Sequence, residues 1–178
     1  MEKIQVLDKT FRLYMPEAEI QDIVKRMASE ISRDYKGKKP ILCPVLTGSY
    51  LFVADLTRQL DFDAQLSFVR FTSYAGLDTT GLVTKVLGFS DRCEGRDVII
   101  VEDIVDSGIS MEYMIEELKQ RNPASIAICT LFFKPGNFQK DFKIDYVGKS
   151  IANDFIVGYG LDYDGMGRTY RNVYILDE

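Results

Sequence analysis

The chain has 178 residues, of which 46% are hydrophobic, and a net charge of −5. This size suits one domain with a substantial core, and the acidic balance argues against nucleic acid or an anionic membrane as partner, since both require basic patches. The absence of histidine excludes imidazole-based catalytic triads and most zinc sites, so acid–base work falls to carboxylates, lysines or tyrosines, and any metal site would be oxygen-rich, as Mg²⁺ prefers.

Two further patterns concern the cellular compartment. No apolar run reaches the roughly 18 residues of a membrane-spanning helix, and the first residues lack the apolar centre of a signal peptide. The three cysteines, Cys43, Cys93 and Cys129, are odd in number and show no CxxC spacing, which favours buried thiols in a reducing compartment. We therefore expect a cytoplasmic protein.

The first sixty residues predict a strand–turn–helix pattern. Weak alternation over 3–14 predicts a short strand or hairpin. A proline at 16 followed by two acidic residues predicts a helix over about 16–35, because proline and acids suit a first helical turn. Residues 40–46 predict a buried strand, followed by a small polar turn and a helix over about 51–60. A second unit of this kind later in the chain implies βαβ architecture with a parallel sheet.

The remaining segments are mostly strand-like. Residues 66–74 and 82–87 predict two strands that flank the sequence AGLDTTG, which is either a plain hairpin loop or a functional lid. Residues 124–133 predict another buried strand. Shorter apolar segments follow at 144–147, 155–157 and 174–176.

The segment Val98–Ser110, with the sequence VIIVEDIVDSGIS, is the most informative part of the chain. Its β-branched start predicts a strand buried on both faces, as in parallel sheets. Glu102 and Asp103 follow at the carboxyl end of this strand, where open α/β sheets bind ligands. The small residues after them lead into a helix over about 108–121, and backbone amides at such a helix start suit a phosphate group.

The polar side chains of this segment suit different parts of a ligand. Adjacent carboxylates repel each other unless a cation or a hydroxyl engages them, so Glu102 and Asp103 are candidates for a ribose diol, directly or through Mg²⁺. Asp106 lies deeper in the turn, where it can meet a reacting base. Ser107 and Ser110 can add hydroxyls to a phosphate site, which is not a P-loop because GxxxxGK[ST] is absent.

The segment Val98–Ser110 closely resembles the phosphoribosyl-pyrophosphate (PRPP) signature of type I phosphoribosyltransferases. Over the whole chain the sequence is similar to hypoxanthine-guanine phosphoribosyltransferases. The other matching segments are VLTGSYLFVADLTRQL at 45–60, FTSYAGLDTTG at 71–81, ICTLFFKP at 128–135 and DYVGKSIANDFIVGYGLDY at 145–163. The resemblance implies an α/β fold in one domain, 1–178: a parallel sheet flanked by helices (core about 16–133) with a small hood (about 1–15 and 134–178).

The resemblance also implies roles for the residues of the signature. The acids at 102 and 103 would serve the ribose hydroxyls and Mg²⁺, and Asp106 would be the catalytic group that handles the proton of the purine imidazole ring. The PRPP-binding set is completed by the turn that holds the 5′-phosphate: Ser107, Gly108, Ile109 and Ser110.

Further roles concern the base and the metal. Lys134 would donate to the purine 6-oxo group, because an ammonium suits that acceptor and disfavours the 6-amino group of adenine. Phe155 would stack on the base, with Ile156 and Asp162 at its edge. Asp162 would also join Glu102 and Asp103 as a metal ligand.

The pyrophosphate site is the least regular part of the match. Its loop corresponds to Leu46, Thr47, Gly48 and Ser49, and Ser73 and Tyr74 correspond to the lid. Many relatives carry a lysine where Thr47 stands, so the contact would rest on backbone amides and Ser49. A C-terminal arginine is also expected. Arg168 matches by its distance from the LDY motif, and Arg171 matches by local sequence with an insertion of three, which favours Arg171.

The implied reaction transfers 5-phosphoribosyl from PRPP to hypoxanthine and guanine, which yields IMP and GMP plus pyrophosphate. The partners would be PRPP and a 6-oxopurine, without nucleic acid or membrane, in a homodimer or homotetramer. Two alternatives stay open: a xanthine-preferring phosphoribosyltransferase, and a nucleotide-sensing RNA-binding regulator on the same fold. The acidic charge counts against the regulator.

Overall fold

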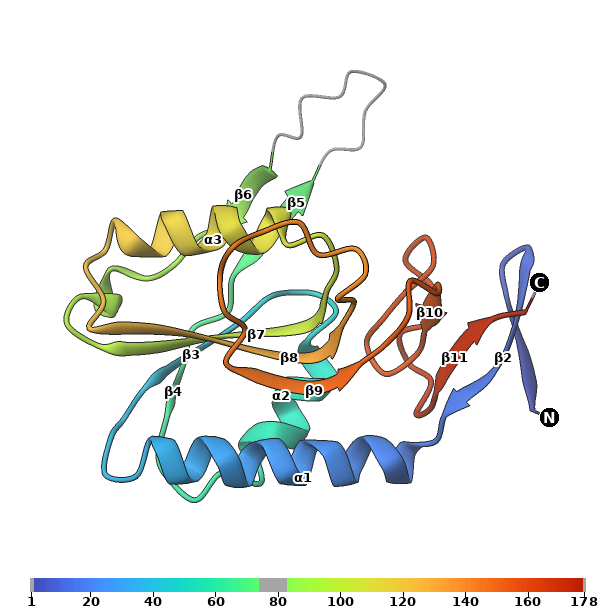
Figure 1. Ribbon diagram of the computed structural model, residues 1–178, viewed down its shortest axis with the longest axis horizontal. Helices are drawn as coiled ribbons and strands as arrows, with labels where there is room; N and C mark the ends of the chain where they lie inside the picture. Colours follow the sequence, from blue (N-terminus) through green and yellow to red (C-terminus); the bar gives the residue numbers. More distant parts are fainter. Residues whose placement is uncertain (1, 74–82, 178) are drawn as a thin grey trace.

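The computed structural model describes residues 2–73 and 83–177. Within them, a five-stranded parallel sheet in the order β4-β3-β7-β8-β9 forms the core, and a four-stranded antiparallel sheet in the order β1-β2-β11-β10 forms a hood at one end (Figure 1). The core strands are β3 (Ile41–Pro44), β4 (Gln65–Leu66), β7 (Asp97–Val105), β8 (Ser125–Phe133) and β9 (Tyr146–Ser150). The hood strands are β1 (Lys3–Val6), β2 (Lys9–Met15), β10 (Ile156–Val157) and β11 (Val173–Leu176).

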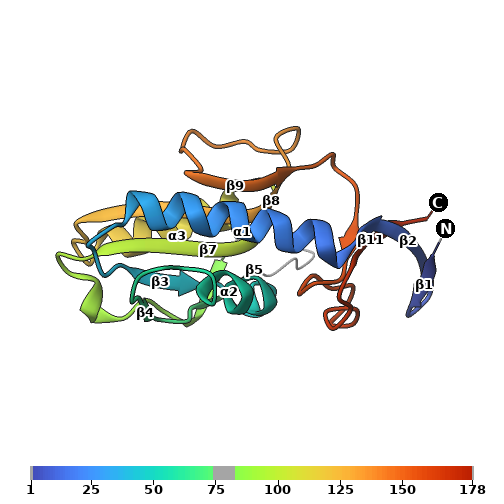
Figure 2. The same cartoon turned by 90° about the horizontal axis from the view of Figure 1, so that it is seen from below.

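Helices cover both faces of the core sheet. Helices α1 (Glu17–Asp34) and α2 (Tyr50–Thr57) lie on one face, and α3 (Ile109–Lys119) lies on the other (Figures 1 and 2). A short 3₁₀ helix, η1 (Asp91–Cys93), precedes β7. No helix among the described residues has the length and apolar character needed to cross a bilayer.

Helix α1 forms as its apolar spacing predicts. Pro16 stands in extended conformation just before the helix, and Glu17 and Glu19 lie in its first turn, where the helix dipole favours negative charge. One stripe of its surface is buried against the sheet, and the stripe consists of Ile20, Val24, Met27, Ala28 and Ile31.

The first half of strand β7 is apolar without interruption because both of its faces are buried. Successive side chains of a strand point to opposite faces, and Ile99 and Val101 accordingly join the core cluster with α1 and α2, whereas Val98 and Ile100 join the cluster with α3. All four side chains are fully buried, so the predicted buried strand is confirmed. Its end was predicted wrongly: β7 continues through the two acids to Val105, because it pairs with β8 that far.

Two other segments differ from the sequence-based expectation. The strand expected over 66–74 is divided into β4 and β5 (Arg70–Ser73), and β5 leaves the core sheet to pair with β6 (Val83–Leu87). Residues 146–150 were expected in the hood, but β9 completes the core sheet instead, since it pairs in parallel with β8. The expected loop over 75–81 and Tyr74 lie outside the described residues.

The hood joins the two ends of the chain. Strand β2 pairs with β11 in antiparallel fashion, and β11 pairs with β10, so both termini lie at this end of the molecule (Figure 1). This pairing confirms the predicted hood built from N-terminal and C-terminal segments. The three cysteines are all buried, as expected for core thiols.

Candidate active site

A cavity of about 410 Å³ opens at the carboxyl ends of β3 and β7. Parallel strands bring the segments that follow them to one edge of the sheet, so the loop after β3, the acids of β7 and the start of α3 meet there. A loop of the hood closes the other side. The cavity is lined by Val45, Leu46, Gly48, Phe71, Glu102, Asp103, Ile104, Ser110, Met114, Asp162 and Arg168.

The two acids of β7 lie side by side in this cavity. Asp103 is only 8% exposed, and its Oδ1 accepts a hydrogen bond from the Ile104 N–H at 2.9 Å. Burial, and then the charge of Asp103, raise the pKa of Glu102 well above its ordinary value. Burial also raises the pKa of Asp103, although the charge of Arg168 acts in the opposite direction. The pair therefore favours a cation or hydroxyl donors at this point.

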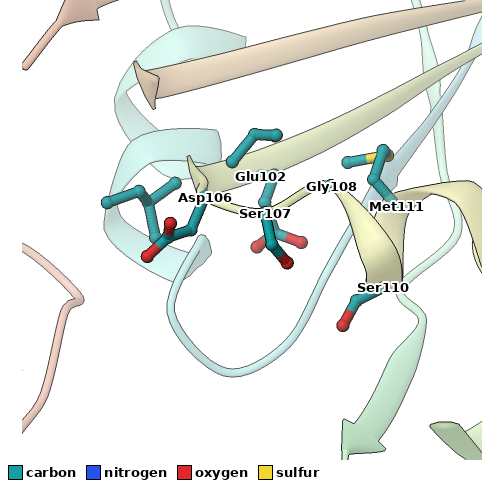
Figure 3. A pocket seen from close by; sticks show the side chains of 8 residues that line it. Glu102, Asp106, Ser107, Gly108, Ser110 and Met111 are labelled. Carbon is teal, nitrogen blue, oxygen red and sulfur yellow. The ribbon is translucent and has the colours of Figure 1, made fainter. Parts of the chain in front are cut away.

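The turn after β7 forms a smaller pocket of about 120 Å³ (Figure 3). Gly108 adopts φ 83° immediately before α3, a left-handed conformation that glycine adopts without strain. A Cβ at this position would lie 2.6 Å from Phe138 Cε2, so the turn also requires glycine for space. Among the lining residues are Glu102, Asp106, Ser107, Gly108 and Ser110. Backbone amides at a helix start and two hydroxyls suit a phosphate group.

Asp106 is held on both carboxylate oxygens. Lys134 Nζ donates to Oδ2 at 3.2 Å, and Asn137 Nδ2 donates to Oδ1. The Lys134 side chain is 10% exposed and that of Asp106 is 43% exposed, so the pair lies at the edge of the site. Sequence reasoning missed Asn137. Its partner is 31 residues away along the chain, and no motif marks the contact.

The loop after β3 approaches the acids through its backbone. The Leu46–Thr47 peptide bond is cis, and a Cβ on Gly48 would overlap the Asp103 carboxylate. Thr47 is exposed. The Ser49 hydroxyl does not reach the cavity, contrary to expectation, because Ser49 is fully buried and its Oγ donates to the Val45 carbonyl at 2.6 Å.

The two candidate arginines occupy different places. Arg168 lines the cavity, where its Nη2 lies 2.8 Å from Asp162 Oδ1 and its Nη1 donates to the Gly160 carbonyl at 2.6 Å. The Arg171 side chain is 83% exposed, and its Nη1 lies 3.9 Å from Glu17 Oε2 outside the cavity. The structure thus places Arg168 and not Arg171 beside the acids. Tyr163 and Met166 close a tight turn between Asp162 and Arg168.

Not all of the residues predicted to bind the purine line this cavity. Lys134 reaches the site through Asp106. Phe155 is 43% exposed and packs edge-on against Tyr163, with ring centroids 5.8 Å apart, and it lines a separate cavity of about 360 Å³. Ile156 is 5% exposed within the hood sheet. Ser73 ends β5, while its lid partner Tyr74 lies outside the described residues.

The acids supply part of a metal site. Among residues 2–73 and 83–177, no group of three or more acidic or cysteine side chains is gathered as a complete metal site. Asp162 is engaged by Arg168 and also accepts from the Gly165 N–H at 2.7 Å. Mg²⁺ is commonly bound by one or two carboxylates together with substrate phosphates and water. Glu102 and Asp103 fit that donor set, with the remaining oxygens left to the substrate.

Comparison with known proteins agrees with this arrangement. The phosphoribosyl transferase domain family matches residues 16–164. A hypoxanthine-guanine-xanthine phosphoribosyltransferase of Tritrichomonas foetus is 35% identical over 179 residues, which cover 100% of this chain and 98% of that protein. The hypoxanthine phosphoribosyltransferase of Escherichia coli K12 is 36% identical over 178 residues, which cover 95% of this chain and 98% of that protein.

A solved structure is similar as well. The crystal structure of a hypoxanthine-guanine phosphoribosyltransferase from Bacillus anthracis matches with a TM-score of 0.87 and 34% identity, over 92% of this chain and 96% of that chain. The expected type I phosphoribosyltransferase fold is therefore confirmed. The chain belongs to the phosphoribosyl transferase family, and within it to the branch that holds the hypoxanthine phosphoribosyltransferases.

Proposed function

We propose that the protein is a purine-salvage enzyme that transfers 5-phosphoribosyl from PRPP to hypoxanthine and guanine, giving IMP and GMP plus pyrophosphate. The observation that carries this proposal is one cavity lined by half-buried Glu102, by buried Asp103, by Ser110 of the phosphate-type turn and by Arg168. The names of the similar proteins point to the same reaction. None of the similar proteins named above is described as RNA-binding, and the one whose name includes xanthine also carries hypoxanthine and guanine in its name.

PRPP would lie along this cavity. Its 5′-phosphate would bind the amides and hydroxyls of Ser107–Ser110, and its ribose hydroxyls would meet Glu102 and Asp103. Arg168 would hold the pyrophosphate together with the backbone of Thr47 and Gly48, since a guanidinium matches phosphate oxygens well. We assign the pyrophosphate arginine to Arg168 for this reason.

Mg²⁺ is the metal that the site suits, with Glu102 and Asp103 as protein ligands and Asp162 as a further carboxylate at the same cavity. When bound there, it would neutralise charge on the departing pyrophosphate. A cation at this point would favour the charged forms of the two acids, whose pKa values are otherwise raised chiefly by burial.

The base would enter between Asp106 and the hood. Lys134 would donate to the 6-oxo group, and Asp106 would accept the proton of the imidazole ring as the new nitrogen–C1′ bond forms and the C1′–pyrophosphate bond breaks. Phe155 would stack on the base, with Ile156 and Asp162 at its edge. The protein's contribution is positioning, charge stabilisation and exclusion of water, with Ser73 and Tyr74 proposed as the lid. We further propose a homodimer or homotetramer, on the resemblance to the family.

Steady-state turnover with PRPP, Mg²⁺ and each of hypoxanthine, guanine, xanthine and adenine tests the function. Hypoxanthine and guanine should be converted, and adenine should not be, because its 6-amino group is a donor that faces the Lys134 ammonium. Absence of turnover with both hypoxanthine and guanine would overturn the proposal. Faster turnover of xanthine than of either would revise the substrate class.

A further inference from the structure

The carboxylate of Asp106 has two partners of different kinds. Lys134 Nζ contacts Oδ2 at 3.2 Å, whereas the Asn137 amide donates to Oδ1. In the proposed reaction, which this inference rests on, Lys134 must turn its donors toward the purine 6-oxo group. Asn137 is not required to contact the base in this reaction. Its amide can therefore stay hydrogen-bonded to Asp106 Oδ1, while Oδ2, once Lys134 has turned away, is available to the base.

Asn137 is itself fixed by the segment around it. Its N–H donates to the Lys134 carbonyl at 3.1 Å, and two residues later the Gln139 N–H donates to the Ser107 carbonyl at 3.1 Å. The next residue, Phe138, packs edge-on against Phe133 with ring centroids 5.2 Å apart. The segment is therefore tied both to the end of β8 and to the phosphate turn.

In the contact between Asn137 and Asp106, the amide is the donor and the carboxylate is the acceptor. An amide nitrogen can only donate, and a carboxylate can only accept, so the contact suits the charged form of Asp106 that must take up the proton. A carboxylate without this donor can turn about its side-chain bonds. Small misplacement of a reacting group is costly, because proton transfer requires hydrogen-bond geometry.

We propose that Asn137 is a positioning residue, which orients the Asp106 carboxylate toward the imidazole ring of the bound base. Asn137 acts through Asp106 and touches neither PRPP nor the base. The prediction that follows is a loss in kcat without a loss in PRPP binding. That loss should disappear when Asp106 can no longer act as a base.

The experiment is a double-mutant cycle with the full-length protein. Asn137→Ala should lower kcat roughly tenfold to a hundredfold, since a hydrogen bond to a charged group is removed, with the KM for PRPP changed less than about twofold. In an Asp106→Asn background, the same change should alter kcat less than about twofold. Asn137→Asp, which keeps the size but reverses the contact to repulsion, should lose at least as much as the alanine variant.

Gln139→Ala is the matched control. Gln139 lies on the same segment, its side chain is exposed, and its backbone contact with Ser107 survives the change, so turnover should stay near that of the unaltered protein. An inactive unaltered protein would overturn the proposed function and this inference together. An active one that tolerates Asn137→Ala or Asn137→Asp, or that loses equally in both backgrounds, would overturn the inference alone.

Discussion

The backbone of Gly48, in the loop after β3, lies directly against the carboxylate of Asp103 in β7, so that a Cβ on Gly48 would overlap Asp103 Oδ2. The contact joins the proposed pyrophosphate loop to one of the two acids of the site. Only a residue without a side chain leaves room for both. A side chain at position 48 must therefore displace either the loop or the acid.

Replacing Gly48 tests this contact. Gly48→Ala should lower kcat/KM for PRPP by at least about tenfold, because the added methyl group must displace either the loop or the acid. The overlap should also lower the free energy of unfolding by about 1–3 kcal/mol. Steady-state kinetics and thermal unfolding measure the two effects. An unchanged KM for PRPP together with unchanged kcat would contradict the proposed place of this loop.

Glu102 should make stability depend on pH. Its pKa is raised in the folded protein above the ordinary 4.5, chiefly by burial, so the folded chain holds this proton more tightly than the unfolded chain does. The contribution of this group to stability is therefore full below the ordinary pKa and is lost as the pH rises above it. Glu102→Gln removes the ionisable group and with it this pH-dependent loss of stability. The Tm of the variant should therefore exceed that of the unaltered protein most near neutral pH, and the difference should vanish below about pH 4.

Thermal unfolding over a pH series without divalent cations measures this gain, and a gain of 1 kcal/mol corresponds to about 2–4 °C at this chain length. Glu94→Gln, at an exposed position, is the control and should change stability by less than about 0.5 kcal/mol. Added Mg²⁺ should raise the Tm of the unaltered protein more than that of the Glu102 variant. A Tm gain that is independent of pH would contradict the raised pKa of Glu102 in the folded protein.

The two arginines form a matched pair of variants. Arg168→Ala should lower kcat/KM for PRPP by about a hundredfold, since it removes a charged donor from the pyrophosphate side of the cavity. Arg171→Ala removes an 83% exposed side chain and should leave kcat/KM within about twofold of the starting value. Initial rates at varied PRPP concentration distinguish them. The reverse order of effects would return the assignment to Arg171.

Lys134 should act on the base and not on PRPP. Lys134→Ala should raise the KM for hypoxanthine or lower its kcat/KM by about tenfold to a hundredfold, because a charged donor to the 6-oxo group is lost. The KM for PRPP should stay within about threefold, since the Lys134 contact in the structure is with Asp106. Equal losses for both substrates would indicate a structural role for this lysine, which is 8% exposed.

Part of this arrangement could be predicted from local patterns. The stripe of α1 and the β-branched run of β7 reveal burial because helices and strands repeat every 3.6 and 2 residues. The order of acids, small residues and helix start after β7 likewise predicts a phosphate-type turn at a strand end. These features depend on neighbours along the chain, so the amino-acid sequence is enough to predict the fold class and the position of the site.

Contacts that depend on the folded path of the backbone could not be predicted in this way. The choice of Arg168 over Arg171 depends on the tight turn at Tyr163–Met166, and the buried hydroxyl of Ser49 depends on the local path of its loop. The pairing of Asn137 with Asp106 joins residues 31 positions apart.

By itself the sequence determined the parallel α/β core, the family and the acidic, phosphate-type turn of Val98–Ser110. Only the tertiary structure decided which arginine faces the acids, that the acids lie within β7, and which amide holds Asp106. The physical reason is that periodicity and turn chemistry are properties of neighbouring residues, whereas hydrogen-bond partners and close approaches are set by how separate segments pack.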